Sequence, residues 1–315
     1  MDTNKAIVYR STGSWYLVKL EDSTFIKARL KGKFRKQNLK TTNPIAVGDI
    51  VDVNIKERDY VVIENIHKRN NYIIRKSVNL SKESHIIASN IDLCVLVCSL
   101  RNPNTATGFI DRFTVTSQAY NIPLLIVFNK IDIYTDNDKI ILDKLISTYQ
   151  KASCLCLATS AENKAGTSKL KEILKDKVTL FSGNSGAGKS SLINTIDSSL
   201  DLRTADISGS HLKGRHTTTF AEMFDLKFGG KIIDSPGIKG MGFIDIEKNE
   251  LANYFPEMFA LLSKCKYNNC MHINEPSCAV KKAVDNEQIS KFRYNNYLAM
   301  YNDEDDLSYR TDIYS

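Results

Sequence analysis

The 315-residue sequence contains no apolar run that approaches the roughly 20 residues a helix needs to cross a bilayer. Its first ten residues, MDTNKAIVYR, lack the basic-then-apolar layout of a secretory signal. With 42% apolar and 25% charged residues, the composition is that of an ordinary globular protein. The length suits two domains, or one domain with appendages. We therefore expect a cytoplasmic monomer with no membrane partner.

The sequence also lacks the even set of cysteines that a simple disulfide framework needs, because it has seven. Four of them lie in apolar, strand-like runs, where cysteine behaves as a small buried hydrophobic residue: Cys94, Cys98, Cys154 and Cys156. The other three gather near one histidine: Cys265, Cys270, His272 and Cys278. The spacing C-x4-C-x-H-x5-C supplies a closed set of three thiolates and one imidazole, which predicts one structural zinc ion.

Acidic residues are absent between Lys27 and Lys40, a stretch that holds seven basic residues. Such a run is either a solvated face or a contact with a polyanion, since each cation set against a phosphate releases a counterion. The candidates for RNA contact are Lys27, Arg29, Lys31, Lys33, Arg35 and Lys36. The opposite charge gathers at residues 303–306, which predicts a flexible acidic C-terminal tail.

Residues 1–70 contain five short β-rich stretches separated by turns, with no long helical pattern. This predicts an all-β barrel of the OB type, whose exposed face commonly binds nucleic acid. Periodicity alone leaves other small β barrels open. Of the aromatic residues in this region, Trp15 is expected in the barrel core.

From about residue 86 the pattern changes to nearly continuous apolar runs such as IDLCVLVCSL and IPLLIVFNK, separated by helical stretches. Such runs are typical of strands buried on both faces of a parallel sheet. We predict a doubly wound α/β domain over residues 71–245, with helices near 108–120, 138–150 and 167–175. Residues 246–315 are predicted to form a mostly helical zinc-binding domain.

A complete G-x-x-x-x-G-K-S motif follows the apolar stretch VTLFS and opens an amphipathic helix. The backbone N–H groups of such a loop and the helix N-terminus bind nucleotide phosphates. Lys189 is expected to reach the β- and γ-phosphates and to act in catalysis, and Ser190 to coordinate Mg²⁺. The predicted phosphate-binding residues are Gly183, Asn184, Ser185, Gly186, Ala187, Gly188, Lys189, Ser190 and Ser191.

Two further motifs predict the parts of the nucleotide site that respond to the γ-phosphate. DSPG begins at Asp234 after an apolar strand, and this carboxylate is suited to holding the Mg²⁺ shell while the Gly237 amide contacts the γ-phosphate. Between the phosphate loop and DSPG lies GRHTTT, where Thr218 is the first candidate to complete magnesium coordination and Thr217 the second. A plain polar surface loop is the alternative for that segment.

The motif NKID closes the apolar strand LLIVF and predicts a guanine-reading loop. An aspartate carboxylate accepts two hydrogen bonds from the N1–H and the exocyclic amine of guanine, a donor pair that adenine does not offer. A second apolar strand ends in TSA, where a backbone amide can meet the guanine oxygen. The predicted base-binding residues are Asn129, Lys130, Ile131, Asp132, Ser160 and Ala161.

These base loops precede the phosphate loop, which reverses the order of an ordinary GTP-binding domain. All of them follow strands, and the ends of parallel strands meet at one edge of a sheet, so we predict a circularly permuted GTPase that hydrolyses GTP to GDP and phosphate. Ile238 follows DSPG and cannot orient the attacking water as glutamine does in many GTPases, which predicts a low basal rate. His216 is the candidate for that role, or else an exposed loop histidine, and Arg215 is a weaker candidate for stabilising charge.

The barrel, the motifs NKID, TSA, GNSGAGKSS, GRHTTT and DSPG in this order, and the late Cys/His cluster resemble the RsgA (YjeQ) family of small ribosomal subunit biogenesis GTPases. The resemblance covers nearly the whole chain. It implies an rRNA-binding OB barrel, the same zinc ligands, and GTP hydrolysis that the small subunit stimulates during its late maturation. Two other interpretations remain: a nucleotide-gated RNA-binding module in which hydrolysis is incidental, and a permuted GTPase that serves the large subunit, against which the barrel and the cluster argue by resemblance.

Overall fold

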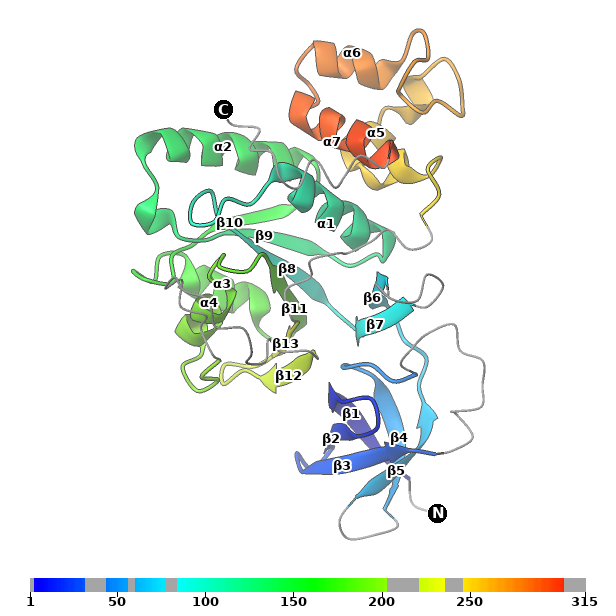
Figure 1. Cartoon of the computed structure of the whole chain (residues 1–315), viewed down its shortest axis with the longest axis vertical. Helices are drawn as coiled ribbons and strands as arrows, with labels where there is room; N and C mark the ends of the chain where they lie inside the picture. Colours follow the sequence, from blue (N-terminus) through cyan, green and yellow to red (C-terminus); the bar gives the residue numbers. More distant parts are fainter. Residues whose placement is uncertain are drawn as a thin grey trace, which may run out of the picture.

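The computed structural model describes residues 3–31, 44–55, 60–76, 84–202, 221–235 and 246–302. Over these residues the chain forms a β barrel, a central α/β sheet and a C-terminal helical module, in that order (Figure 1). None of the described helices is long and apolar enough to span a bilayer.

Five strands build the barrel: β1 (Thr3–Ser11), β2 (Tyr16–Leu20), β3 (Phe25–Leu30), β4 (Ile50–Ile55) and β5 (Val61–Ile66). They follow the order β1-β2-β3-β5-β4, and β1 pairs with β4 to close the barrel. Neighbours are antiparallel except β3 and β5, which are parallel. Alternate side chains point inward, so that Val8, Val18, Val51 and Ile63 are fully buried. The expected OB-type barrel is confirmed.

A short antiparallel pair, β6 (Tyr72–Lys76) and β7 (Ser84–Ser89), follows the barrel along the chain and precedes the central sheet. The central sheet has the order β10-β9-β8-β11-β13-β12. Its strands are β8 (Leu93–Cys98), β9 (Leu124–Phe128), β10 (Leu155–Ala158), β11 (Val178–Gly183), β12 (Glu222–Asp225) and β13 (Lys231–Asp234). All neighbours are parallel except β12 and β13. The carboxyl ends of the parallel strands therefore share one edge of the sheet, as the doubly wound prediction requires.

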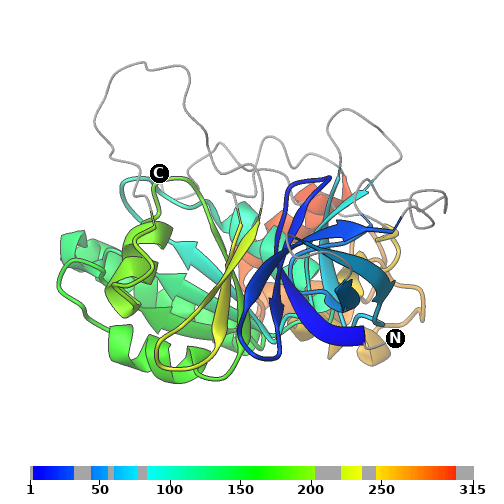
Figure 2. The same cartoon turned by 90° about the horizontal axis from the view of Figure 1, so that it is seen from below.

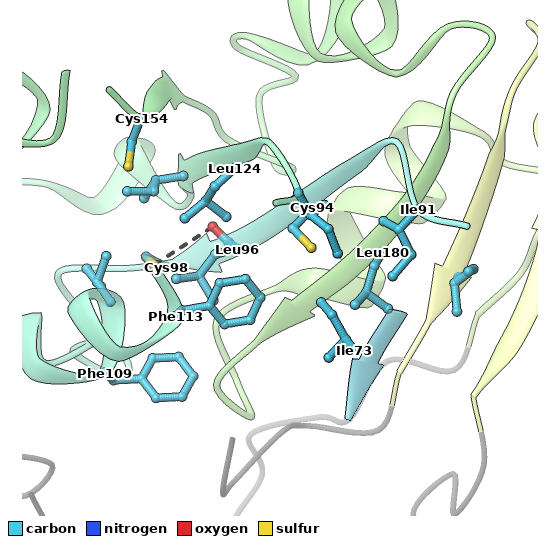
Figure 3. Packing of buried hydrophobic residues seen from close by; sticks show 14 of the residues in the cluster. Ile73, Ile91, Cys94, Leu96, Cys98, Phe109, Phe113, Leu124, Cys154 and Leu180 are labelled. Carbon is cyan, nitrogen blue, oxygen red and sulfur yellow. Dashed lines mark hydrogen bonds between the residues drawn. The ribbon is translucent and has the colours of Figure 1, made fainter. Parts of the chain in front are cut away.

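Helices cover both faces of this sheet: α1 (Thr107–Ala119), α2 (Asp136–Lys151), α3 (Thr167–Leu174) and α4 (Lys189–Ile196). On one face, Phe109 and Phe113 of α1 pack with Leu96 and Cys98 of β8 (Figure 3). On the other face, the apolar side chains of α3 and α4 pack with Leu93, Val95 and Val97 of β8. Strand β8 is buried throughout, because its alternate side chains enter the two different cores.

Three of the four cysteines expected in apolar runs, Cys94, Cys98 and Cys154, are buried, and Cys156 is partly buried. Burial raises the pKa of Cys154 and of Cys156 to about 12, so these thiols stay protonated at neutral pH. They act as small apolar residues of the sheet.

The barrel and the central sheet are hydrogen-bonded to each other, which sequence analysis did not predict. Strand β1 pairs antiparallel with β12, with Arg10 opposite Glu222, so one eleven-stranded sheet runs through both (Figure 2). At this junction Asp225 accepts hydrogen bonds from the Tyr9 hydroxyl and the Lys19 ammonium, each at 2.6 Å. Arg10 and Glu222 form a more exposed ion pair at 2.5 Å.

The C-terminal module packs on the outer surface of α1 (Figure 1). Its elements are η3 (Leu251–Tyr254), α5 (Pro256–Phe259), η4 (Leu262–Lys264), α6 (Ala279–Asp285) and α7 (Lys291–Tyr301). Val115 of α1 belongs to the same apolar core as Phe255 and Tyr297 of the module. Within this core Arg293 is fully buried and binds both Asp111 of α1 and Glu257 of α5. The mostly helical module that the sequence predicts is therefore present and seated against α1.

Candidate nucleotide site and metal cluster

The phosphate loop joins Gly183, the last residue of β11, to Lys189, the first of α4, at the carboxyl edge of the sheet. Gly188 has a φ of +87°, and a Cβ there would lie 2.4 Å from Nδ2 of Asn129. Only glycine lets the loop pass so close to the base-reading segment. Ser190 and Ser191 lie in the first turn of α4, where backbone N–H groups have no partner within the helix. The loop and helix start thus form an anion-binding geometry.

Lys189 contacts the Asp234 carboxylate and donates from Nζ to the Ser235 carbonyl at 3.2 Å. Burial lowers the pKa of Lys189 to about 8. The contact brings the end of β13 against the start of α4, although 45 positions separate the two residues. The carboxylate of Asp234 and the hydroxyl of Ser190 therefore lie at the same end of the sheet, and both are oxygen donors of the kind that Mg²⁺ prefers.

Asn129 lies at the end of β9, is fully buried, and connects three parts of the site. Its Nδ2 donates to the Ala187 carbonyl in the phosphate loop at 3.1 Å. Its Oδ1 accepts from the Thr159 hydroxyl at 3.2 Å, at the end of β10. One side chain thus holds the base-reading loop, the second base loop and the phosphate loop together.

Asp132 lies in the short 3-10 helix η2 (Ile131–Ile133) and is exposed at the edge of the sheet. The hydroxyl of the buried Ser160 donates to its carboxylate. The Ile131 amide donates to the Thr159 carbonyl at 3.2 Å, which joins the two base loops through their backbones. Ala161 is linked to α4, because its carbonyl accepts from the Thr195 hydroxyl at 3.2 Å. An open carboxylate held in this way can accept hydrogen bonds from a planar donor pair such as that of guanine.

Lys130 has a left-handed backbone, with φ of +66°, and its Nζ donates to the Asn102 carbonyl at 2.5 Å. Its Cε lies 3.5 Å from the position that a Cβ on Gly188 would take, so the aliphatic stem lies over the phosphate loop. Burial lowers the pKa of Lys130, and the nearby Asp132 acts in the opposite direction. Asn102 could not be identified from the sequence, because a backbone carbonyl leaves no signal in the residue type.

The remaining predicted nucleotide residues lie outside the described part of the chain. They are Arg215, His216, Thr217, Thr218, Gly237 and Ile238.

The basic candidates that the structure describes lie on β3 and at the residue after it. Lys27 and Arg29 are exposed, and Lys31 pairs with Glu64 at 3.1 Å. Trp15 is only partly buried rather than in the core, because it lies in the turn before β2, where the Arg29 guanidinium stacks 3.9 Å from the ring centroid. The other candidates, Lys33, Arg35 and Lys36, lie outside the described residues, as does the acidic tail.

The four expected metal ligands converge. The sulfur atoms of Cys265, Cys270 and Cys278 and a ring nitrogen of His272 lie within 4.8 Å of one another. His272 Nδ1 lies 3.3 Å from the Cys278 sulfur and 3.7 Å from that of Cys265. Burial raises the pKa of Cys270 to about 12, and only a cation at the centre would reverse that preference and favour thiolates. The residues can therefore hold a metal ion, and the donor set fits one with tetrahedral coordination.

The loop between the second and fourth ligands is held by hydrogen bonds within it and from α7. Glu275 accepts from the Met271 amide at 2.7 Å and from the Ile273 amide at 2.8 Å. From α7, the Tyr294 hydroxyl donates to the His272 carbonyl and the Tyr297 hydroxyl to the Met271 carbonyl, both at 2.6 Å. The ligands are thus oriented by a carboxylate and two phenols that are not ligands themselves.

Comparison with known proteins identifies relatives over nearly the whole chain. Residues 66–244 match the family model described as RsgA GTPase, and residues 5–63 match the RsgA N-terminal domain. A small ribosomal subunit biogenesis GTPase RsgA from Flavobacterium psychrophilum is 53% identical over 314 residues, covering 98% of this chain and 95% of the relative. The protein of the same name from Bacteroides fragilis is 47% identical over 306 residues, covering 97% and 99%.

Two solved structures share the fold. The crystal structure of YjeQ from Thermotoga maritima has a TM-score of 0.78 and 33% identity, covering 96% of this chain and 98% of that one. The structure of YloQ, described as a circularly permuted GTPase, has a TM-score of 0.74 and 27% identity, covering 99% and 98%. The permuted order that the motifs predict is therefore confirmed at the level of the fold.

Proposed function

The chain belongs to the RsgA family and is a GTP hydrolase, and we propose that it acts in the late maturation of the small ribosomal subunit. Two relatives named small ribosomal subunit biogenesis GTPase RsgA are 53% and 47% identical and aligned over nearly the whole chain. The structural observation that carries the nucleotide part is the hydrogen bond from Asn129 Nδ2 to the Ala187 carbonyl. It joins the base loop to the phosphate loop in a chain where their order is reversed.

In this proposal each edge of the nucleotide has its own binding residues. Asp132 accepts the N1–H and the exocyclic amine of guanine, and the TSA segment at Ser160 and Ala161 meets the oxygen edge of the base. The backbone of residues 183–191 and the Lys189 ammonium bind the phosphates. The support is that all these groups lie along one edge of the sheet.

Magnesium would be held by Ser190 and Asp234, with Thr218 as a third ligand from outside the described residues. When bound there, the ion neutralises charge on the β- and γ-phosphates. Lys189 shares the charge on the same oxygens, and the Gly237 amide contacts the γ-phosphate. Support for this arrangement comes from the contact between Lys189 and Asp234.

Hydrolysis without a partner is expected to be slow, because Ile238 cannot orient a water molecule. We assign that role to His216, because an imidazole can accept a hydrogen bond from water and act as a general base. His216→Ala should abolish stimulation of hydrolysis while leaving GTP affinity within about two-fold. Full stimulation of the variant would exclude this role.

The partner is proposed to be the small subunit and its rRNA, contacted by the basic side of the barrel. The exposed Lys27 and Arg29 and the half-buried Trp15 offer cations and an aromatic face to RNA on β3 and the neighbouring turn. Acting on this partner, the protein would work in the cytoplasm as a monomer. The metal is proposed to be zinc in a structural role, since all four ligand positions come from the protein.

The experiment that tests the function compares GTP hydrolysis by the purified protein alone, with small ribosomal subunits and with large ones. A low basal rate that only small subunits raise strongly is the expected result. Equal rates in all three samples, with GTP still bound, would overturn the ribosomal role. Stimulation by large subunits alone would assign the protein to that subunit.

A further inference from the structure

Tyr134 lies two residues beyond Asp132, outside the predicted motifs, and its side chain is nearly fully buried beneath the base loop. It is 6% exposed and belongs to the same apolar core as Phe109 and Phe128. Its hydroxyl donates to the Asn129 carbonyl at 2.8 Å and accepts from the Leu100 amide at 2.8 Å. A buried phenol has one proton to donate and lone pairs to accept, and these two bonds use both capacities.

The segment that Tyr134 reaches, residues 99–105 between β8 and α1, is itself ordered by local hydrogen bonds. Ser99 and Thr105 close it from both ends, because the Ser99 amide donates to the Thr105 hydroxyl at 3.0 Å and the Thr105 amide to the Ser99 carbonyl at 2.8 Å. The Ser99 hydroxyl donates to the Arg101 carbonyl at 2.6 Å. The segment therefore has a defined shape to which another loop can be fastened.

Two further contacts fasten the base loop to this segment on either side of Tyr134. On one side Lys130 donates to the Asn102 carbonyl. On the other, Arg101 Nε donates to the Asp138 carboxylate at 2.6 Å, and Asp138 in turn receives the Thr135 amide at 2.7 Å at the start of α2. Tyr134 lies between them in the chain, and its hydroxyl contacts both the Leu100 amide and the Asn129 carbonyl.

We propose that Tyr134 is a positioning residue for guanine recognition: its hydroxyl fixes the Asn129 carbonyl, and through it the Asp132 carboxylate, against residues 99–105. Two base-loop residues before Asp132 depend on this backbone, since Asn129 reaches the phosphate loop and Lys130 lies over it. Loss of the hydroxyl takes this partner from the Leu100 N–H and from the buried Asn129 carbonyl, and the base loop relaxes away from its place. The inference rests on the proposed guanine site and adds a residue that contacts no nucleotide.

The test is Tyr134→Phe, which removes only the hydroxyl, with affinities measured for GDP and for IDP. Hypoxanthine lacks the exocyclic amine, so the ratio of the two affinities reports how well Asp132 is placed. The variant should bind GDP on the order of ten-fold more weakly and lose most of its preference for GDP over IDP. Tyr9→Phe, which removes another buried hydroxyl that donates to Asp225, is the matched control and should keep the wild-type ratio.

The outcomes separate the inference from the site on which it rests. If the wild-type protein does not prefer GDP to IDP, the proposed guanine site itself is wrong. If the wild type prefers GDP and Tyr134→Phe keeps that preference, the positioning role of Tyr134 is wrong, even where overall affinity or thermal stability has fallen. If Tyr134→Phe does not fold, Leu100→Pro offers a second variant, because it removes the N–H that holds the hydroxyl. It should lower the same ratio, and a wild-type ratio in that variant would overturn the inference.

Discussion

Arg293 of α7 donates from Nη1 to Oδ1 of Asp111 in α1 at 2.6 Å, although 182 positions separate the two residues. Both are fully buried, and the same guanidinium binds both carboxylate oxygens of Glu257 at 2.7 and 3.0 Å. Asn296 donates to the other Asp111 oxygen at 2.6 Å. Desolvation of these charges is costly, so the network stabilises the packing of the C-terminal module on α1 only while every partner is present.

Asp111→Ala should therefore strongly destabilise the protein, because it leaves a buried guanidinium without one of its partners. We expect the free energy of unfolding to fall by about 3–5 kcal/mol. Urea unfolding measures it. The control is Lys169→Ala, which breaks an ion pair with Glu172 whose side chains are 65% and 67% exposed, and which should cost less than about 1 kcal/mol. Equal costs for the two variants would show that the buried network contributes no more than a surface pair.

Gly188→Ala should weaken nucleotide binding, since its Cβ would lie 2.4 Å from Asn129 Nδ2 in a buried contact. The phosphate loop and the base loop would have to separate, and we expect GDP affinity to fall by about ten-fold or more. Gly13→Ala is the matched control, because Gly13 also has a positive φ, +83°, but a Cβ there meets nothing within 4 Å. Calorimetric titration of both variants distinguishes a local steric effect from backbone strain. Unchanged affinity in Gly188→Ala would mean that the two loops need not approach each other.

Asp132→Asn should exchange guanine for xanthine as the preferred base, because the amide can donate to the xanthine C2 oxygen where the carboxylate could only accept. GTP affinity should fall by about 10- to 100-fold while XTP binding improves. Asp136→Asn, at an exposed carboxylate four positions later, should leave both affinities unchanged. If GTP binds Asp132→Asn as tightly as the wild type, the guanine-reading residue has been misassigned.

Removal of the metal should unfold the C-terminal module before the rest of the chain. A strong chelator should release about one zinc ion per chain, and hydrogen exchange should then accelerate over residues 246–302 more than over the central sheet. Cys270→Ser should lose the metal, while Cys156→Ser, outside the cluster, should retain it. Metal content by mass spectrometry is the direct measurement, and a full complement of zinc in Cys270→Ser would contradict the assigned ligand set.

Asp225 should hold the barrel against β12 at neutral pH and release it in acid. Burial would raise the pKa of Asp225, but the hydrogen bonds from Lys19 and Tyr9 outweigh it and keep the pKa below the usual range. A carboxylate with a depressed folded-state pKa contributes stability above its unfolded value of about 3.9, and loses it as the pH falls through the folded value. Amide exchange at the β1–β12 pairing should accelerate in that acid window.

At neutral pH, Asp225→Ala should already show the faster exchange, because it leaves the Tyr9 hydroxyl and the Lys19 ammonium without this partner. The expected cost is about 1–3 kcal/mol of local opening free energy. Arg10→Ala removes the more exposed ion pair at the same junction and should cost no more than about 1 kcal/mol. Equal protection in Asp225→Ala and the wild type would show that the strand pairing alone holds the two domains.

Local sequence patterns predicted the elements in which residues close together in the chain bind the same ligand or are buried in the same strand. The phosphate loop, the NKID segment and the Cys/His cluster each place all their groups within at most fourteen consecutive positions, so spacing alone indicates the chemistry. The apolar runs of β8 and β9 likewise predict strands buried on both faces. The reversed order of the motifs did not prevent the prediction of a single nucleotide site. Parallel strands bring their carboxyl ends to one edge of the sheet, whatever the order of the strands in the chain.

Tertiary structure alone decided which distant residues became partners. Tyr9 and Lys19 meet Asp225 across more than 200 positions, Arg293 meets Asp111 across 182, and Tyr134 reaches Leu100 across 34. A charged or hydroxyl-bearing side chain at any of these positions could equally be hydrated at the surface. It needs a hydrogen-bond partner within the protein only because packing excludes water from it. The sequence by itself therefore determined the chemistry of the sites and the type of fold. How the barrel and the metal-binding module are joined to the nucleotide site was set by buried polar contacts that exist only once the chain is folded.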